Sequence, residues 1–229
     1  MSAVHGFGGP GRVTPASVDR AGNANLVAAA ARERAAVVLM SVVGASANSP
    51  IELFRAKHEA EVHLQASGLP WTIVRATAFV ELWAEIMARP IVFGVGNNPI
   101  NFVSVHDVAG VVERAVVDGA LRGQVLEVGG PENLTFNQLA NLLKELRNQH
   151  RRIRHVPRWT LQTAAPFSRR ACAAVAIDTI DMTFDPSTAT GRLDRPMTDV
   201  RTALSGAISE ARPLQRNRAG HDIGPPANR

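Results

Sequence analysis

The 229-residue sequence predicts an α/β fold built on an incomplete, doubly wound parallel sheet, with a small region on its C-terminal side. Helical patterns alternate with strand patterns along most of the chain, which is typical of parallel pairing. Residues 36–43, AVVLMSVV, form a continuous apolar run, as expected of a strand covered on both faces. Hydrophobic residues make up 45% of the chain, enough for a sizeable core.

The elements of the first half follow from local signals. Thr14 is the expected N-cap of a first helix, with Pro15 at its first position, running through residues 19–34. After the apolar strand, residues 49–52 match a capping box. The helix that this box opens is expected to end at Gly68, before a second strand, WTIVRA, at 71–76.

The second half continues the alternation with less regular spacing. The expected elements are a helix over 79–88, a short segment at 91–94, a strand at 100–105, a helix at 106–118 closed by Gly119, a strand at 124–130, a capping box at 135–138 that opens a helix, and a short strand at 152–157. Residues 213–229 are rich in Pro, Gly, Arg and Asn, and we expect them to be disordered.

Composition excludes several classes of protein. No apolar run approaches the roughly 18 residues that span a membrane, and the first residues do not match a secretory signal. The single Cys172 excludes an intramolecular disulfide and suits a reducing, cytoplasmic location. The seven histidines show no metal-ligand spacing, so we expect no metal site. The net charge of +5 comes almost entirely from arginine.

Three expected strand ends supply candidate site residues. They are Gly6 to Gly9 after a very short strand, Ser41 to Gly44, and Arg75 to Phe79. In an open parallel sheet, ligands bind where the carboxyl ends of the strands open into loops. Lys57 lies about two turns into the helix that follows the second end, within reach of the same crevice.

Five segments, in order, resemble the NmrA-like, atypical short-chain dehydrogenase/reductase family. They are VDRAGNANLVAAA, VVLMSVVGA, ELFRAKHEAEVHLQASGLPWTIVRATAF, INFVSVHDVAGVVERAV and VLEVGGPENLTFNQLANLL, and the match covers about residues 5–145. The resemblance implies a Rossmann-like NAD(P)-binding domain over 1–130 and a helical, substrate-side region over 131–212. It also implies an oxidoreductase-like role with NAD or NADP, and a dinucleotide and an unknown small molecule as partners.

The resemblance also implies roles for particular residues. The cofactor-binding candidates are Gly6, Phe7, Ser41, Val42, Lys57, Arg75, Ala76, Thr77 and Phe79. Lys57 and Ser41 are the catalytic candidates. Lys57 either binds the nicotinamide ribose or pairs with Glu61 one turn on. Ser41 either faces the nicotinamide carboxamide or caps its loop. Arg75 either reaches the crevice or pairs with a carboxylate, which is the favoured interpretation because a buried charge needs a partner.

Two departures from the family pattern limit these roles. The GxxGxxG turn that holds the pyrophosphate is missing, and the chain starts at the tail of what would be the fourth strand. Residue 53, four before Lys57, is leucine, and the chain contains no tyrosine, so the usual tyrosine–lysine proton relay is not available. Another acid would be needed, such as Ser41, His58 or water. We expect dinucleotide binding to be weak or absent.

A sheet without its first strands would leave residues 36–43 as an edge, which invites pairing with a second copy or a complementing chain. Two alternative functions stay open. One is a non-catalytic redox-sensing or partner-binding regulator, which the lack of tyrosine favours. The other is a nucleic-acid binder that uses the seven arginines between Arg147 and Arg170. A solvated basic face is the favoured interpretation of those arginines.

Overall fold

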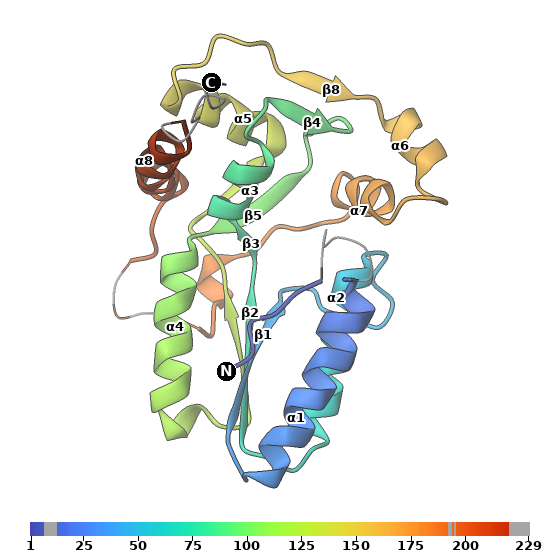
Figure 1. Cartoon of the computed structure of the whole chain (residues 1–229), viewed down its shortest axis with the longest axis vertical. Coiled ribbons are helices and arrows are strands. Elements are labelled where there is room, and N and C mark those ends of the chain that lie inside the picture. Colours follow the sequence, from blue (N-terminus) through green and yellow to red (C-terminus); the bar gives the residue numbers. More distant parts are fainter. Residues whose placement is uncertain (7–12, 192–193, 195, 220–229) are drawn as a thin grey trace, which may run out of the picture.

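The structure is a computed structural model that describes residues 1–6, 13–191, 194 and 196–219 (Figure 1). The candidate residue Phe7 lies outside this part of the chain. The strands are β1 (Val37–Val42), β2 (Trp71–Ala76), β3 (Ala78–Phe79), β4 (Ile91–Phe93), β5 (Pro99–Val103), β6 (Gln124–Val128), β7 (Glu132–Thr135) and β8 (Arg154–Val156). The main helices are α1 (Asn23–Arg32), α2 (Glu52–Gln65), α3 (Val80–Ile86), α4 (Val105–Val117), α5 (Phe136–Leu146), α6 (Arg158–Ala164), α7 (Arg169–Ile177) and α8 (Val200–Ala219).

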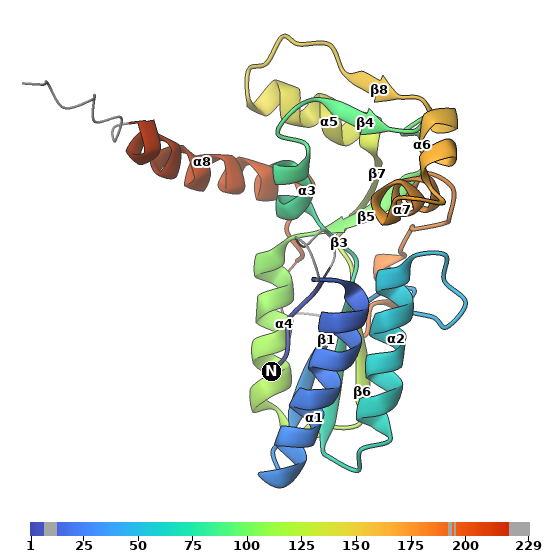
Figure 2. The ribbon, with the colours of Figure 1, turned by 45° about the vertical axis from the view of Figure 1, so that its right-hand side comes forward.

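The largest parallel sheet has the strand order β1-β2-β6, with helices on both faces. On one face, Val37 and Leu39 pack with Leu64 of α2. On the other face, Val38 and Met40 pack with the apolar side of α4. Figures 1 and 2 show α4 on one side of the sheet and α1 and α2 on the other. Both faces of β1 are therefore covered, which confirms the doubly wound α/β prediction.

β1 is the end strand of this sheet, as predicted. Its outer side carries a single bridge within the described residues, to Ser2. The Ser2 N–H donates to the Val38 carbonyl at 2.8 Å, and the Met40 N–H donates to the Ser2 carbonyl at 2.9 Å. The short strand expected before Gly6 is thus reduced to one bridged residue.

A second packed region lies above the carboxyl ends of this sheet (Figure 1). It holds two small sheets, β3-β5-β7 and β4-β8, with α3, α5 and α8. Its core joins Val80, Ile100 and Phe102 to Leu139 and Leu204. The expected division at residue 130 therefore does not separate the two packed regions, because the chain enters the second region after β2 and returns to the first as α4 and β6.

The two expected capping boxes have different outcomes. Thr135 and Gln138 form theirs in full at the start of α5. The box at 49–52 is wrong, since the Ser49 hydroxyl accepts from the N–H of Ile51, two residues on, and α2 begins only at Glu52. The Glu52 carboxylate, which the box would place on the Ser49 backbone, instead lies 3.4 Å from Arg169 and forms a tertiary ion pair with it.

The first and last helices also differ from expectation. The first begins as a π-helix over Ala16–Gly22 before it continues as α1, a wider turn that the residue pattern did not predict. This turn buries the side chains of Asp19 and Asn23. At the other end, α8 runs over Val200–Ala219, and the expected disorder from residue 213 stays a prediction.

Candidate functional site

Lys57 joins three parts of the chain at the carboxyl end of β1. Its Nζ donates to the carbonyls of Val4 at 2.9 Å and Met40 at 3.1 Å, and lies 2.9 Å from Asp19 Oδ1. Lys57 is only 5% exposed and Asp19 is fully buried. An ammonium has three donor hydrogens, and three protein oxygens surround this one. The side chain thus lies at the strand ends, as predicted.

The interpretation that Lys57 pairs with Glu61 is wrong, because Glu61 binds Arg75. The predicted contact between Lys57 and a nicotinamide ribose stays a prediction. The observed partners constrain how such a contact could form. A ribose hydroxyl would have to displace one of the three protein oxygens around the Lys57 Nζ, or share an N–H of the ammonium with it.

Asp19 places a negative charge at the first of the three expected strand ends, beside Gly6. Its Oδ2 accepts the N–H of the cofactor-binding candidate Gly6 at 2.7 Å. Its Oδ1 is close enough to Lys57 for an ion pair but has no aligned hydrogen bond. A buried carboxylate on the Gly6 N–H disfavours a phosphate at that donor, because like charges repel strongly where water is excluded. Asp19 was not among the predicted site residues.

Ser41 is the candidate whose environment is incomplete. It is 4% exposed, and its hydroxyl has no hydrogen-bond partner within the described residues. Strand alternation places it on the same face as Val37 and Leu39, toward α1 and α2. Buried hydroxyls are normally hydrogen-bonded, so this one has unused capacity to bind a ligand or water. The Nδ1 atom of His58 on α2 is also buried and also has no hydrogen-bond partner within the described residues.

Arg75 pairs with carboxylates, as the favoured interpretation predicted. Its Nε and Nη2 donate to the two oxygens of Glu61 at 3.0 and 2.7 Å, and Nη1 donates to Glu127 at 3.2 Å. The hydrogen bonds to Glu61 outweigh burial and raise the pKa of Arg75. This network closes the sheet face beside Ser41, which is the register neighbour of Arg75.

The loop after β2 is held by an amide that sequence reasoning missed. The Thr77 hydroxyl donates to Asn101 Oδ1 at 2.8 Å, and the same oxygen accepts the Gly130 N–H at 2.9 Å. Asn101 is fully buried in β5. The sequence does contain a clue to this role, because Asn101 is the single polar residue within the apolar stretch INFV, and a polar side chain buried in a strand needs hydrogen-bond partners.

The remaining candidates lie at the same strand ends. Val42 and Ala76 are register partners at the ends of β1 and β2. Phe79 packs against the core that contains Val103, its partner in β5. The predicted residues at the two described strand ends are therefore brought to one edge of the sheet, with Gly6 beside them through Asp19.

The described residues were predicted to contain no metal site and no membrane span, and two structural findings bear on these predictions. No three His, Cys, Asp or Glu side chains in this part of the chain are grouped so that they could hold a metal ion. Within the same residues, every helix is too short or too polar to cross a membrane.

Comparisons with known proteins place the chain within a family and among related folds. A family model described as NAD(P)H-binding matches residues 2–118, just over half of the chain. Prestalk A differentiation protein A of Dictyostelium discoideum is 26% identical over 115 residues, which are 48% of this chain and 36% of that protein. NAD(P)H azoreductase of Xenophilus azovorans is 26% identical over 111 residues, 46% of this chain and 39% of that protein. The chain thus matches less than two fifths of each of these relatives.

Similarity in structure extends further along the chain. The NADPH-dependent quinone oxidoreductase of Escherichia coli, solved with NADPH, superposes with a TM-score of 0.66 over 81% of this chain and 70% of its own. The two sequences are 20% identical, so this likeness establishes the fold alone.

Proposed function

We propose, on the premise that this chain belongs to the NAD(P)H-binding family, that it binds a nicotinamide dinucleotide at the carboxyl ends of β1 and β2 and acts as an oxidoreductase-like protein of the NmrA-like type. The observation that carries this proposal is the buried hydroxyl of Ser41 at those strand ends, which has no partner among the described residues. A nicotinamide carboxamide offers both a donor and an acceptor for such a group.

The polar groups at the strand ends fit the nicotinamide end of the dinucleotide better than its pyrophosphate. Ser41, Thr77 and the strand-end backbone are neutral polar groups suited to the nicotinamide and its amide. The Gly6 N–H, by contrast, is already bound to the Asp19 carboxylate, which disfavours a pyrophosphate. We therefore propose that the dinucleotide binds weakly, with its nicotinamide end at Ser41.

When bound, a reduced nicotinamide supplies a hydride to an electron-poor acceptor. Two of the proteins named above are an azoreductase and a quinone oxidoreductase, and we propose a conjugated acceptor of this kind as the substrate class. Its reduction takes up a proton as well as the hydride. The chain has no tyrosine, so we propose His58 or water as the proton source, with Ser41 orienting the carboxamide.

The test compares wild type with Ser41→Ala and with the control Ser209→Ala, whose hydroxyl donates to a carbonyl on the exposed part of α8. NADPH and NADH binding is measured by calorimetry, and turnover by loss of dinucleotide absorbance with a quinone or azo dye. We expect Ser41→Ala to weaken binding by about five- to tenfold, the effect of one hydrogen bond, while Ser209→Ala has no effect. Absence of binding by both dinucleotides, or equal binding by wild type and Ser41→Ala, would contradict the proposal.

A non-catalytic redox sensor is the second candidate. Two observations favour it: the chain has no tyrosine, and the ammonium of Lys57 is engaged by three protein oxygens. A sensor would show the same dependence of NADPH binding on Ser41 without steady turnover of any acceptor. The kinetic arm of the experiment therefore separates the two candidates.

A further inference from the structure

Four arginines gather at one hollow in the second packed region. The hollow has a volume of about 460 Å³ and is lined by Arg89, Pro90, Ile91, Arg151, Arg152 and Arg154. We call it the arginine groove. A smaller adjoining hollow of about 340 Å³ shares Arg89, Pro90 and Arg151 with it. The groove therefore centres on Arg89 and Arg151.

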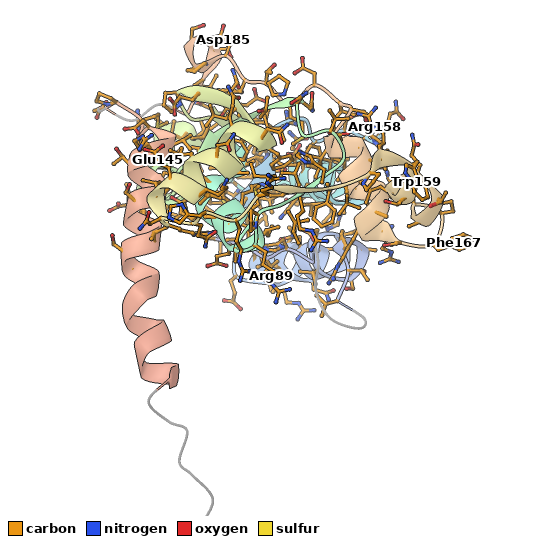
Figure 3. All side chains as sticks on the ribbon, turned by 90° about the horizontal axis from the view of Figure 1, so that it is seen from above. Arg89, Glu145, Arg158, Trp159, Phe167 and Asp185 are labelled. Atoms are coloured by element: carbon orange, nitrogen blue, oxygen red, sulfur yellow. The ribbon has the colours of Figure 1, made fainter. Side chains whose placement is uncertain are left out.

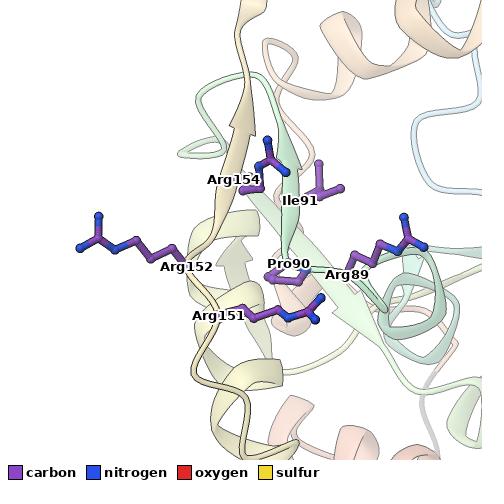
Figure 4. A pocket seen from close by; sticks show the side chains of 6 residues that line it. All are labelled: Arg89, Pro90, Ile91, Arg151, Arg152 and Arg154. Carbon is purple, nitrogen blue, oxygen red and sulfur yellow. The ribbon is translucent and has the colours of Figure 1, made fainter.

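The fold, rather than the chain sequence, brings these arginines together. β4 and β8 pair in parallel with Ile91 opposite Arg154, and the Arg154 N–H donates to the Pro90 carbonyl at 2.8 Å. In Figure 4, Arg151 extends across Pro90 toward the side on which Arg89 lies, whereas Arg152 points away. Two segments about 60 residues apart are thus fixed side by side, and arginines from both line the same hollow.

None of these four side chains has a hydrogen-bond or ion-pair partner within the described part of the chain, although other arginines do. Arg75 and Arg158 bind buried carboxylates. Arg147, next to the groove in sequence, donates to the carbonyls of Met87 and Ala84, and burial lowers its pKa. Among the described residues, no carboxylate therefore neutralises the guanidinium groups of the groove.

We infer that the arginine groove binds a small phosphate-bearing ligand, separately from the dinucleotide site. The guanidinium fork matches two phosphate oxygens at once, and grouped cations repel one another until an anion binds between them. The volume is that of a small-molecule site. In Figure 1, β4 and β8 lie in the upper part of the molecule, beyond the strand ends where Ser41 is located.

A small ligand fits the groove better than a nucleic acid does. Single-stranded nucleic acids are held by aromatic side chains that stack on the bases, and no aromatic residue lines the groove. The exposed aromatics Trp159 and Phe167 lie on and after α6, apart from Arg89 in Figure 3. The arginines between Arg147 and Arg170 do not act together, because Arg158 and Arg169 are paired with Asp178 and Glu52.

The test is a calorimetric titration of the full chain with inorganic pyrophosphate at low salt. The variant Arg89→Gln/Arg151→Gln removes the two central cations. The control Arg32→Gln/Arg34→Gln removes two equally exposed cations at the end of α1. We expect saturable 1:1 binding by wild type and the control. The groove variant should bind at least about tenfold more weakly, since each charge-assisted contact contributes roughly that factor.

Three results would overturn the inference: no saturable binding by wild type, equal weakening in both variants, or tight binding of a single-stranded oligonucleotide that pyrophosphate does not displace. NADPH binding should be unchanged in the groove variant. Its loss there would assign the groove to the dinucleotide itself and refute a separate site. Because the four arginines are exposed, unchanged circular dichroism is expected and serves as the folding check.

Discussion

At the scale of single residues, the geometry around Lys57 explains why a lysine occurs in a chain so rich in arginine. Its three oxygen partners come from Val4, Met40 and Asp19, at 2.9 to 3.1 Å. A compact ammonium lies within reach of oxygens from three separate segments at once, whereas a planar guanidinium holds its donors in one fork. An arginine, although it carries the same charge, would therefore not replace Lys57 without loss.

We predict that Lys57→Met destabilises the protein by about 3–5 kcal/mol, because it leaves the buried Asp19 carboxylate uncompensated. Lys144→Met, at the only other lysine, on α5, should change the free energy of unfolding by less than about 0.5 kcal/mol. Urea unfolding followed by circular dichroism measures both variants.

Two further variants separate a structural role for Lys57 from a purely ligand-binding one. Lys57→Arg should also destabilise the fold, and Lys57→Met/Asp19→Asn should recover part of the loss by removing the unpaired charge. If Lys57→Met unfolds at the same urea concentration as wild type and only NADPH binding weakens, the structural role proposed for Lys57 is wrong.

At the scale of elements, the end of α7 is joined to the turn between β4 and β5 by one carboxylate. Asp178 accepts the N–H groups of Val95 and Gly96 at 3.2 and 2.9 Å, and Arg158 Nη2 at 2.7 Å. Gly94 and Gly96 have φ values of +80° and +70°, and a Cβ on Gly94 would collide with Asp178. The turn therefore needs glycine both for its backbone conformation and for the approach of Asp178.

The Asp178 contact should depend on pH. Burial alone would raise the pKa of Asp178, but the Gly96 N–H, Arg158 and the Val95 N–H outweigh it and hold the pKa below its ordinary value. The folded state thus favours the carboxylate. Its contribution is fully present above the unfolded-state pKa and is lost as the pH falls through the folded-state pKa.

We accordingly predict that Asp178→Asn lowers stability by about 1–3 kcal/mol at neutral pH, because all three partners lose a charged acceptor. The difference from wild type should shrink as the pH falls below the ordinary aspartate range. Glu113→Gln, an exposed carboxylate on α4, serves as the control. Thermal unfolding across a pH series tests this, and a difference independent of pH would refute the charge-based explanation.

At the scale of the whole molecule, the outer side of β1 is the feature with the widest consequence. On the outer side of β1, the described residues supply the Ser2 bridge, the Lys57 ammonium on the Met40 carbonyl and the Ala45 N–H on the Val42 carbonyl, but no paired strand. An end strand with free N–H and C=O groups pairs readily with another strand. We propose that this side of the sheet pairs with a second copy of the chain or with a complementing chain.

The corresponding prediction is that the purified chain self-associates. Light scattering coupled to size exclusion should show a mass that rises from one chain toward two with concentration. Because backbone hydrogen bonds would drive the association, added salt should change it little. A single-chain mass at all concentrations would exclude self-pairing and leave only a complementing chain.

Much of the sheet and its helices could be predicted from the residues because their signals are local. The apolar run at 36–43, the strand at 71–76 and the capping box at 135–138 needed only hydrophobic patterning or neighbouring side chains. The same locality explains the failures. The π-helix around Asp19 and the loss of the 49–52 box both follow from partners distant in the chain, Lys57 and Arg169.

The sequence by itself determined the α/β architecture, the position of Lys57 at the strand ends and the lack of any tyrosine for proton transfer, because periodicity and composition are properties of the chain alone. Only the tertiary structure decided which charges neutralise each other. It paired Lys57 with Asp19 and Arg75 with Glu61, and among the described residues it left the Ser41 hydroxyl and the arginines around β4 and β8 without partners. Pairing energies act through space over a few ångströms, and sequence spacing does not report those distances.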